Sequence, residues 1–122
     1  MILGVGTDIV EISRMARAME KKAFLHKCFT NAEIAQGLSR GAKAAQVFAG
    51  YFAAKESVAK ALGTGFRRFG PRDIEIYQTE LGKPCVSLKF QPIVPRGTLI
   101  EIDISISHER HYATAVAIIH GR

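Results

Sequence analysis

The stretch that decides the fold of this chain runs from Ala44 to Gly65 and reads AAQVFAGYFAAKESVAKALGTG. Because a helix turns by about 100° per residue, its bulky apolar residues fall on one continuous stripe. Gly63 and Gly65, at the end of the stretch, are typical of a helix stop. We therefore expect a helix from Ala44 to Leu62 that packs against the core through the apolar stripe of Val47, Phe48, Tyr51, Phe52, Val58, Ala59 and Leu62.

Charged residues lie in and beside this stripe. Lys55 falls inside it, and we expect its methylenes to follow the apolar surface while its ammonium reaches water. Glu56 falls at the edge, where a carboxylate is costly unless something pairs with it. Two interpretations of Glu56 stay open. One is an ion pair with Lys60 at i+4, which is the more common arrangement, and the other is coordination of a hard cation such as Mg²⁺.

The residues at the start of the chain predict a buried strand, because an apolar run rich in β-branched residues covers positions 2–10. Gly4-x-Gly6 lies inside this strand, and Ile9 stands where a third glycine would complete a dinucleotide-binding fingerprint, so we reject that function. Asp8 is near the end of the strand. A carboxylate there either caps the following helix or serves as an active-site ligand, and both interpretations stay open.

Two shorter helices are expected between this strand and the long helix. Apolar residues at helical spacing predict the first over residues 12–23. Thr30 and Glu33 match a capping box at the start of the second, which is short because Gly37 and Gly41 flank its end. The opposite face of the first helix is basic, a pattern typical of either a solvated surface or a docking site for an acidic partner. This basic face consists of Arg14, Arg17, Lys21 and Lys22.

The second half of the chain predicts strands. Residues alternate between apolar and polar around Ile74 and Ile76, and again over 86–90 after a turn at Glu80–Pro84. The alternation over 100–106 is the clearest, and the stretch 112–119 is apolar on both faces, so it is expected to be a central strand. We therefore predict one α+β domain over residues 1–122, with one long and two shorter helices packed against a largely antiparallel sheet.

Composition narrows the functional classes. The chain has 122 residues with 48% apolar and 23% charged, which excludes disorder, and 17 basic against 11 acidic residues give a net charge of +6. The positive charge favours an acidic partner, such as nucleic acid, an anionic membrane, a phosphorylated ligand or an acidic protein. Cys28 and Cys85 lie far apart, and no leader or transmembrane segment is recognisable, so we expect a cytoplasmic protein with reduced thiols. His108 and His111 do not make a credible zinc site without a third ligand nearby.

Four segments in the same order resemble the motifs of one family, the holo-[acyl-carrier-protein] synthases, which are small bacterial 4′-phosphopantetheinyl transferases. The first is Gly6-Thr7-Asp8-Ile9-Val10-Glu11-Ile12-x-Arg14. The second, Phe52-Ala53-Ala54-Lys55-Glu56-Ser57-x-x-Lys60-Ala61-Leu62-Gly63-Thr64-Gly65, is highly specific. Gly82-Lys83-Pro84 and Ser105-Ile106-Ser107-His108 complete the set. The resemblance covers nearly the whole chain and implies the 4′-phosphopantetheinyl transferase fold.

The resemblance implies a reaction in which phosphopantetheine moves from coenzyme A to a serine of apo acyl carrier protein, with release of adenosine 3′,5′-bisphosphate. Asp8 and Glu56 are then the ligands of a Mg²⁺ ion, which favours the cation interpretation of Glu56 over a plain ion pair with Lys60. We expect Lys60 to contact the phosphate or protonate the leaving group. The base that accepts the serine proton stays open between a metal-bound water and a carboxylate.

The resemblance also implies binding sites for both substrates. The expected coenzyme A residues are Lys43, Lys60, Gly63, Gly82, Lys83, Pro84, Ser107 and His108. The basic face of Arg14, Arg17, Lys21 and Lys22 is expected to dock the acidic carrier protein. The family is homotrimeric with active sites between subunits, so Asp8 and Glu56 of one subunit would face Ser107 and His108 of its neighbour. Nucleic acid and membranes are not expected partners.

Two segments depart from the family pattern. Tyr51 stands where relatives commonly have a basic residue, so any phosphate contact made there is lost or passes to Lys43 or Arg40. The stretch Gln91–Gly97, with two prolines, replaces a short helix that relatives usually have before the last pair of strands.

Two other functions compete with this one. A non-enzymatic basic module that binds nucleic acid or an acidic protein accounts for the charge but leaves Asp8 and Glu56 without a purpose. A Mg²⁺-dependent phosphoryl-transfer enzyme that acts on another nucleotide keeps the carboxylates but not the docking face.

Overall fold

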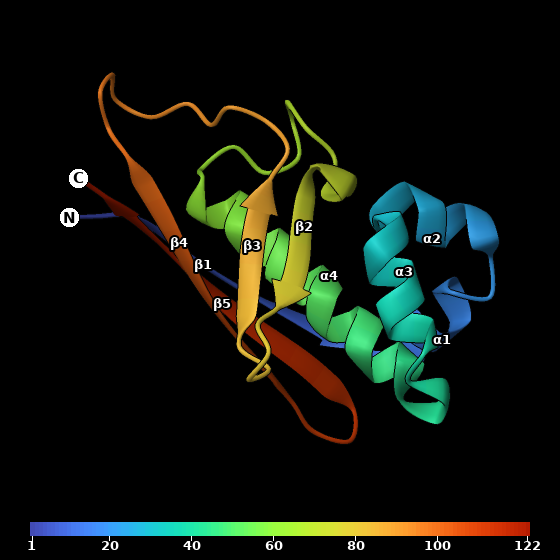
Figure 1. Cartoon of the computed structure of the whole chain (residues 1–122). Coiled ribbons are helices and arrows are strands. Elements are labelled where there is room, and N and C mark those ends of the chain that lie inside the picture. The colour runs from blue at the N-terminus through green and yellow to red at the C-terminus, as the bar shows by residue number, and fades with distance from the viewer.

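A three-stranded antiparallel sheet forms one layer of the protein, whose computed structural model describes all residues 1–122. Its strand order is β1-β5-β4, so the last strand of the chain is central, as predicted. The two termini meet at one end of this sheet, where the Gly121 amide donates to the Met1 carbonyl oxygen at 2.7 Å (Figure 1). The strands are β1 (Ile2–Glu11), β4 (Ile100–His108) and β5 (Tyr112–Gly121).

The long helix α4 (Ala44–Ala61) packs directly on the backbone of β1. A Cβ atom on Gly6 would overlap the carbonyl oxygen of Ser57, and one on Gly4 would overlap that of Ala61. The Ser57 hydroxyl donates to the Ala115 carbonyl oxygen at 3.0 Å and ties the helix to β5 as well. Gly4-x-Gly6 is therefore a packing motif that lets a helix and a strand approach without side chains between them.

A second, two-stranded sheet crosses α4 (Figure 1). It consists of β2 (Ile74–Gln78) and β3 (Pro84–Leu88), and β3 lies alongside β4. All strand pairing is antiparallel, but it is divided between two sheets. The strand expected to reach Phe90 ends at Leu88. The loop over residues 91–97 contains no helix, which agrees with its departure from the family pattern.

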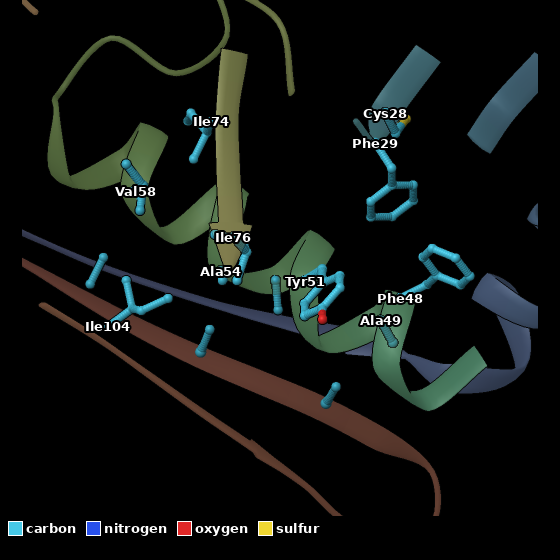
Figure 2. Close-up of a cluster of buried hydrophobic side chains, with 14 of the residues drawn as sticks. Cys28, Phe29, Phe48, Ala49, Tyr51, Ala54, Val58, Ile74, Ile76 and Ile104 are labelled. Carbon is cyan, nitrogen blue, oxygen red and sulfur yellow. The ribbon is translucent and has the colours of Figure 1, made fainter. Parts of the chain in front are cut away.

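The core lies between α4 and the elements around it. Figure 2 shows Phe29 and Phe48 side by side, with ring centroids 4.9 Å apart and ring planes inclined at 55°, and Ile74 and Ile76 of β2 buried beside α4. Tyr51 is also buried in this cluster, although its hydroxyl is polar. Ile104 completes the contact from the sheet side, on the face of β4 predicted to point inward.

The first predicted helix is divided in two, which corrects the expectation of one continuous basic face. Helix α1 (Ile12–Ala18) ends before a turn at Met19–Lys21, and α2 (Lys22–Cys28) follows. The turn lets each short helix bury its own apolar residues, Met15 on α1 and Leu25 on α2. Arg14 and Arg17 therefore lie on α1, Lys21 in the turn and Lys22 on α2. These two helices and α3 (Asn31–Leu38) gather beside α4 (Figure 1).

Lys55 does not reach water, so the expectation of a solvent-directed ammonium is wrong. Its side chain is fully buried, and its Nζ lies 2.7 Å from Oε1 of Glu33, which is equally buried. Burial lowers the pKa of Lys55, and the Glu33 carboxylate opposes this shift. Glu33 also forms the predicted capping box with Thr30, so one carboxylate starts α3 and neutralises a buried lysine. None of the helices is both long and apolar enough to cross a membrane.

Candidate active site

Lys60 joins α4 to the end of β1. Its Nζ donates to Oδ1 of Asp8 at 3.0 Å and to the carbonyl oxygen of Thr7 at 2.9 Å. An ion pair between Lys60 and Glu56, which was one of the two interpretations left open for Glu56, is absent, because β1 lies so close to α4 that the lysine reaches Asp8 on the strand. Asp8 likewise forms no hydrogen bond with a helix amide, so the capping interpretation of Asp8 is wrong as well.

Glu56 and Asp8 line the same cavity, which has a volume of about 430 Å³ and also contains Lys60 and Arg14. The pKa of Glu56 is raised first by burial and then by the negative charge of Asp8, while Lys60 opposes the shift. The cavity thus holds two carboxylates close enough to repel each other. The approach of α4 to β1 through Gly4 and Gly6 creates this proximity.

The donor set of this cavity fits a hard cation. Mg²⁺ is usually held by one or two carboxylates and fills its other positions with water and phosphate oxygens. Asp8 and Glu56 supply two such carboxylates, and their mutual repulsion is relieved by a bound cation. No group of three or more His, Cys, Asp or Glu side chains is placed to hold a metal ion.

A second cavity, of about 390 Å³, lies between the start of α4, the β2–β3 turn and the end of β4. Its charged lining residues are all basic or, for histidine, capable of a positive charge, and no carboxylate lines it. The cavity is therefore suited to an anion. It brings together four of the predicted coenzyme A residues, which are Lys43, Gly82, Pro84 and His108.

The second cavity also contains residues that were not among the predicted coenzyme A residues. Gln46 stands on α4 one turn after Lys43, and its Nε2 lies 3.0 Å from Nε2 of His108. The i, i+3 spacing from Lys43 is a signal that could have identified Gln46. Arg40 and Tyr51 line the same cavity, and burial raises the pKa of the Tyr51 hydroxyl.

The turn after His108 is held by its own carboxylate. Oε1 of Glu109 accepts hydrogen bonds from the amides of His111 and Tyr112, each at 2.7 Å. These bonds, led by the one from His111, lower the pKa of Glu109. The β4–β5 turn is therefore braced immediately beyond the point where His108 enters the second cavity.

The four other predicted coenzyme A residues lie outside this cavity, and one of them, Lys60, lines the carboxylate cavity instead. Gly63 and Lys83 do not line it. Ser107 faces the opposite side of the sheet, in an open depression of about 480 Å³ that it shares with Asp8 and Lys60. The carboxylate cavity and the basic cavity have no lining residue in common. Within one chain, the metal-binding candidates and the basic cavity are therefore separate sites.

The predicted docking residues are cations without carboxylate partners. Arg14, Arg17, Lys21 and Lys22 form no ion pair in the structure. Arg14 differs from the others because it also lines the carboxylate cavity. The basic surface of α1, the turn and α2 therefore begins at the rim of the cavity that holds Asp8 and Glu56.

Comparisons with known proteins identify the family of the chain. The family model described as the 4′-phosphopantetheinyl transferase superfamily matches residues 4–117. A holo-[acyl-carrier-protein] synthase of Clostridium novyi is 50% identical, with 98% of this chain and 88% of that protein covered. The enzyme of the same name from Fusobacterium nucleatum is 45% identical, with 98% and 99% covered.

A solved structure shows the same likeness. The holo-(acyl-carrier-protein) synthase of Bacillus anthracis, crystallised in complex with CoA (3′,5′-ADP), superposes with a TM-score of 0.79 at 30% identity. The match covers 98% of this chain and 96% of that one. Sequence motifs, fold and relatives lead to the same conclusion: the chain belongs to the holo-[acyl-carrier-protein] synthase family of the 4′-phosphopantetheinyl transferase superfamily.

Proposed function

We propose that this chain, as one domain over residues 1–122, transfers 4′-phosphopantetheine from coenzyme A to a serine hydroxyl of apo acyl carrier protein. The serine oxygen forms a bond to the β-phosphorus of coenzyme A, and the bond from that phosphorus to the bridging oxygen breaks. Adenosine 3′,5′-bisphosphate leaves, and the serine gives up its proton. The observation that carries the proposal is the meeting of Asp8, Glu56 and Lys60 in one cavity, in a chain that shares its family's fold and motifs.

Asp8 and Glu56 would hold a Mg²⁺ ion, which when bound neutralises the pyrophosphate and orients it for attack. Lys60 contributes a second positive charge. An ammonium has three N–H donors, and two of them are engaged by Asp8 and Thr7. The third N–H is free to donate to a phosphate oxygen. The lysine side chain is half-exposed, so its ammonium can contact a substrate that binds from solvent. Lys60 thereby stabilises the charge that develops on the leaving phosphate, or protonates it.

The basic cavity would hold the nucleotide part of coenzyme A. Lys43, Arg40 and His108 supply positive or hydrogen-bonding groups for the 3′-phosphate, and Gln46 holds the His108 ring. The turn of Gly82, Lys83 and Pro84 would lie on the adenine side. In this assignment Arg40 and Lys43 would supply any phosphate contact that is lost because Tyr51 stands where relatives commonly have a basic residue. Gly63 and Ser107 would contact the coenzyme outside the basic cavity.

Assembly as a homotrimer would bring the two cavities together. The outer face of the sheet β1-β5-β4 exposes apolar side chains, with Val5 at 56% and Ile9 at 60% exposure, which a second copy would cover. The carboxylate cavity and the basic cavity share no lining residue within one chain, which also favours an active site built from two subunits. Ser107 lies on this outer face and would then approach the neighbour's carboxylates.

The acidic carrier protein would dock on Arg14, Arg17, Lys21 and Lys22, with its serine directed toward the cavity that Arg14 lines. We place the reaction in the cytoplasm, where the free thiols of Cys28 and Cys85 stay reduced. Neither nucleic acid nor a membrane has a part in the proposal.

The proposal is tested by product release. The purified chain is incubated with apo acyl carrier protein, coenzyme A and Mg²⁺, and adenosine 3′,5′-bisphosphate is measured by chromatography. We expect release that depends on the carrier protein and stops with a chelator. Release without carrier protein would instead support a phosphoryl-transfer enzyme of another kind.

A further inference from the structure

The buried ion pair of Glu33 and Lys55 occupies the free edge of β2. In the two-stranded sheet β2 pairs only with β3, so its other edge has no strand partner. Lys55 Nζ donates to the Ile74 carbonyl oxygen at 2.5 Å, and Glu33 Oε2 accepts from the Ile76 amide at 2.7 Å. The pair thus gives this edge one donor and one acceptor, which are the groups that a neighbouring strand would supply.

The hydrogen-bonding capacity of Lys55 is fully used. Its three N–H groups meet three acceptors, Glu33 Oε1 at 2.7 Å, the Pro71 carbonyl at 2.8 Å and the Ile74 carbonyl. The other bond that Glu33 accepts comes from the Thr30 amide at 2.8 Å. Both side chains are fully buried. The pair therefore joins α4, the start of α3, the 3-10 turn Pro71–Asp73 and β2 at one point.

This point links the two elements that form opposite walls of the basic cavity. One wall is the β2–β3 hairpin, which contributes Gln78, Gly82 and Pro84, and the opposite wall is α4, which contributes Gln46 and Tyr51. Glu33 and Lys55 do not line the cavity themselves. A buried ion pair is seldom more stabilising than apolar side chains of the same size. A gain in stability therefore does not by itself explain why this pair is present.

We propose that Glu33 and Lys55 are a positioning pair for the transfer reaction, because they hold the β2–β3 hairpin against α4 at the spacing that the coenzyme A nucleotide requires. This inference rests on the proposed function. The pair acts through the hairpin and touches neither substrate. Its loss should therefore weaken coenzyme A binding selectively and leave carrier-protein docking, on the other side of the site, unchanged.

The test compares Glu33→Gln with Ile119→Ala, a control that removes buried apolar volume from β5 without touching the hairpin. In Glu33→Gln we expect the KM for coenzyme A to rise by about tenfold to a hundredfold, the range for a displaced binding group. The kcat at saturating coenzyme A and the KM for carrier protein should stay within about twofold of wild type. Ile119→Ala should lower the Tm and leave both KM values unchanged.

A milder variant keeps the test decisive if Glu33→Gln does not fold. Glu33→Asp retains the charge but is one methylene shorter, so it cannot reach the Thr30 and Ile76 amides together. It should raise the KM for coenzyme A with a smaller loss of Tm. Equal KM values for coenzyme A in Glu33→Asp and Ile119→Ala would overturn the positioning role.

Hydrogen exchange separates this inference from the proposed function. The Ile76 amide should exchange faster in the Glu33 variants than in wild type or Ile119→Ala, with no coenzyme present. Unchanged exchange would overturn the inference even in an active enzyme. A wild-type protein that binds no coenzyme A would contradict the proposed function, whereas the exchange result would still report on the hairpin.

Discussion

Nζ of Lys60 lies 3.0 Å from Oδ1 of Asp8, and this contact joins the middle of the chain to its first strand. The two residues are 52 positions apart in the sequence. The lysine side chain is 52% exposed and the aspartate side chain 18% exposed. An ion pair this accessible contributes only about 0–1 kcal/mol to stability, so its importance lies in directing the ammonium toward the substrate.

The first prediction concerns Lys60→Ala. We expect kcat to fall by about a hundredfold, the effect of removing one preorganised donor from a site of developing charge. The Tm should change little because the pair is exposed. Steady-state kinetics and thermal denaturation check the two expectations.

Lys89→Ala is a matched control for Lys60→Ala. It breaks an ion pair of similar exposure, between Lys89 and Glu75 at 3.4 Å, with the lysine side chain 49% exposed. The control should keep full activity. If both variants lost activity equally, the special role of Lys60 would have to be abandoned.

The second prediction concerns the metal. Glu56→Gln removes a half-buried charge beside Asp8, so the metal-free variant should have a higher Tm than wild type. Mg²⁺ at about 100 times its Kd adds about 2.7 kcal/mol to a protein that binds it, which raises the Tm of wild type. The variant should show little or no such increase and no activity. A Mg²⁺ response of Glu56→Gln equal to that of wild type would remove Glu56 from the ligand set.

The third prediction concerns the approach of α4 to β1. Gly6→Ala places a methyl group against the Ser57 carbonyl oxygen, so the helix must move away from the strand that carries Asp8. We expect a loss of about 1–3 kcal/mol in the free energy of unfolding, as for other overpacked sites, together with a large loss of activity. Gly70→Ala is the control, because the added Cβ would meet no atom within 4 Å apart from its chain neighbours, and the φ of −106° at this position suits alanine. An active Gly6→Ala variant would show that the spacing of the carboxylate cavity is not critical.

The fourth prediction concerns docking of the carrier protein. The double variant Arg17→Glu/Lys21→Glu avoids Arg14, which lines the carboxylate cavity. It should raise the KM for carrier protein by about tenfold and weaken its dependence on salt, while the KM for coenzyme A stays constant. Arg96→Glu reverses one charge in the loop between β3 and β4, which is not part of the proposed docking surface, and should have no effect. Parallel changes in both KM values would argue against a docking surface.

The fifth prediction concerns acid stability. A hydrogen bond from the Thr30 side chain, followed by the charge of Lys89, lowers the pKa of Glu75. Because the folded-state pKa lies below the unfolded value, Glu75 stabilises the fold above the ordinary glutamate pKa of about 4.3, and this contribution is lost as the pH falls through the lowered pKa. Glu75→Gln should therefore flatten the decrease in Tm below this pH. An unchanged acid profile would contradict the assignment.

Local patterns predicted the elements that carry the site. The stripe on 44–62 corresponds to α4, the capping box at Thr30 and Glu33 is present, and the apolar stretch after residue 112 is the central strand. Each of these follows from residues a few positions apart. The same rule suggested Glu56 as one possible partner of Lys60, because an i+4 neighbour is visible in the sequence, whereas Asp8, which is 52 residues away, is not.

Long-range contacts account for the other errors. The periodicity of residues 12–23 is continuous, and only the burial of both Met15 and Leu25 explains why the chain turns at Met19–Lys21. Lys55 resembled a solvent-directed lysine because its partner, Glu33, belongs to another helix. The role of Gly4-x-Gly6 became visible only when α4 was placed against β1.

The most direct test of the central claim is the intact mass of the carrier protein after incubation with this enzyme, coenzyme A and Mg²⁺. Asp8→Asn serves as the matched control, because it keeps the shape of the side chain and removes its charge. Our account predicts that wild type adds one phosphopantetheine group to one serine and that Asp8→Asn adds it far more slowly. A carrier protein of unchanged mass after incubation with the folded wild-type enzyme would contradict the account.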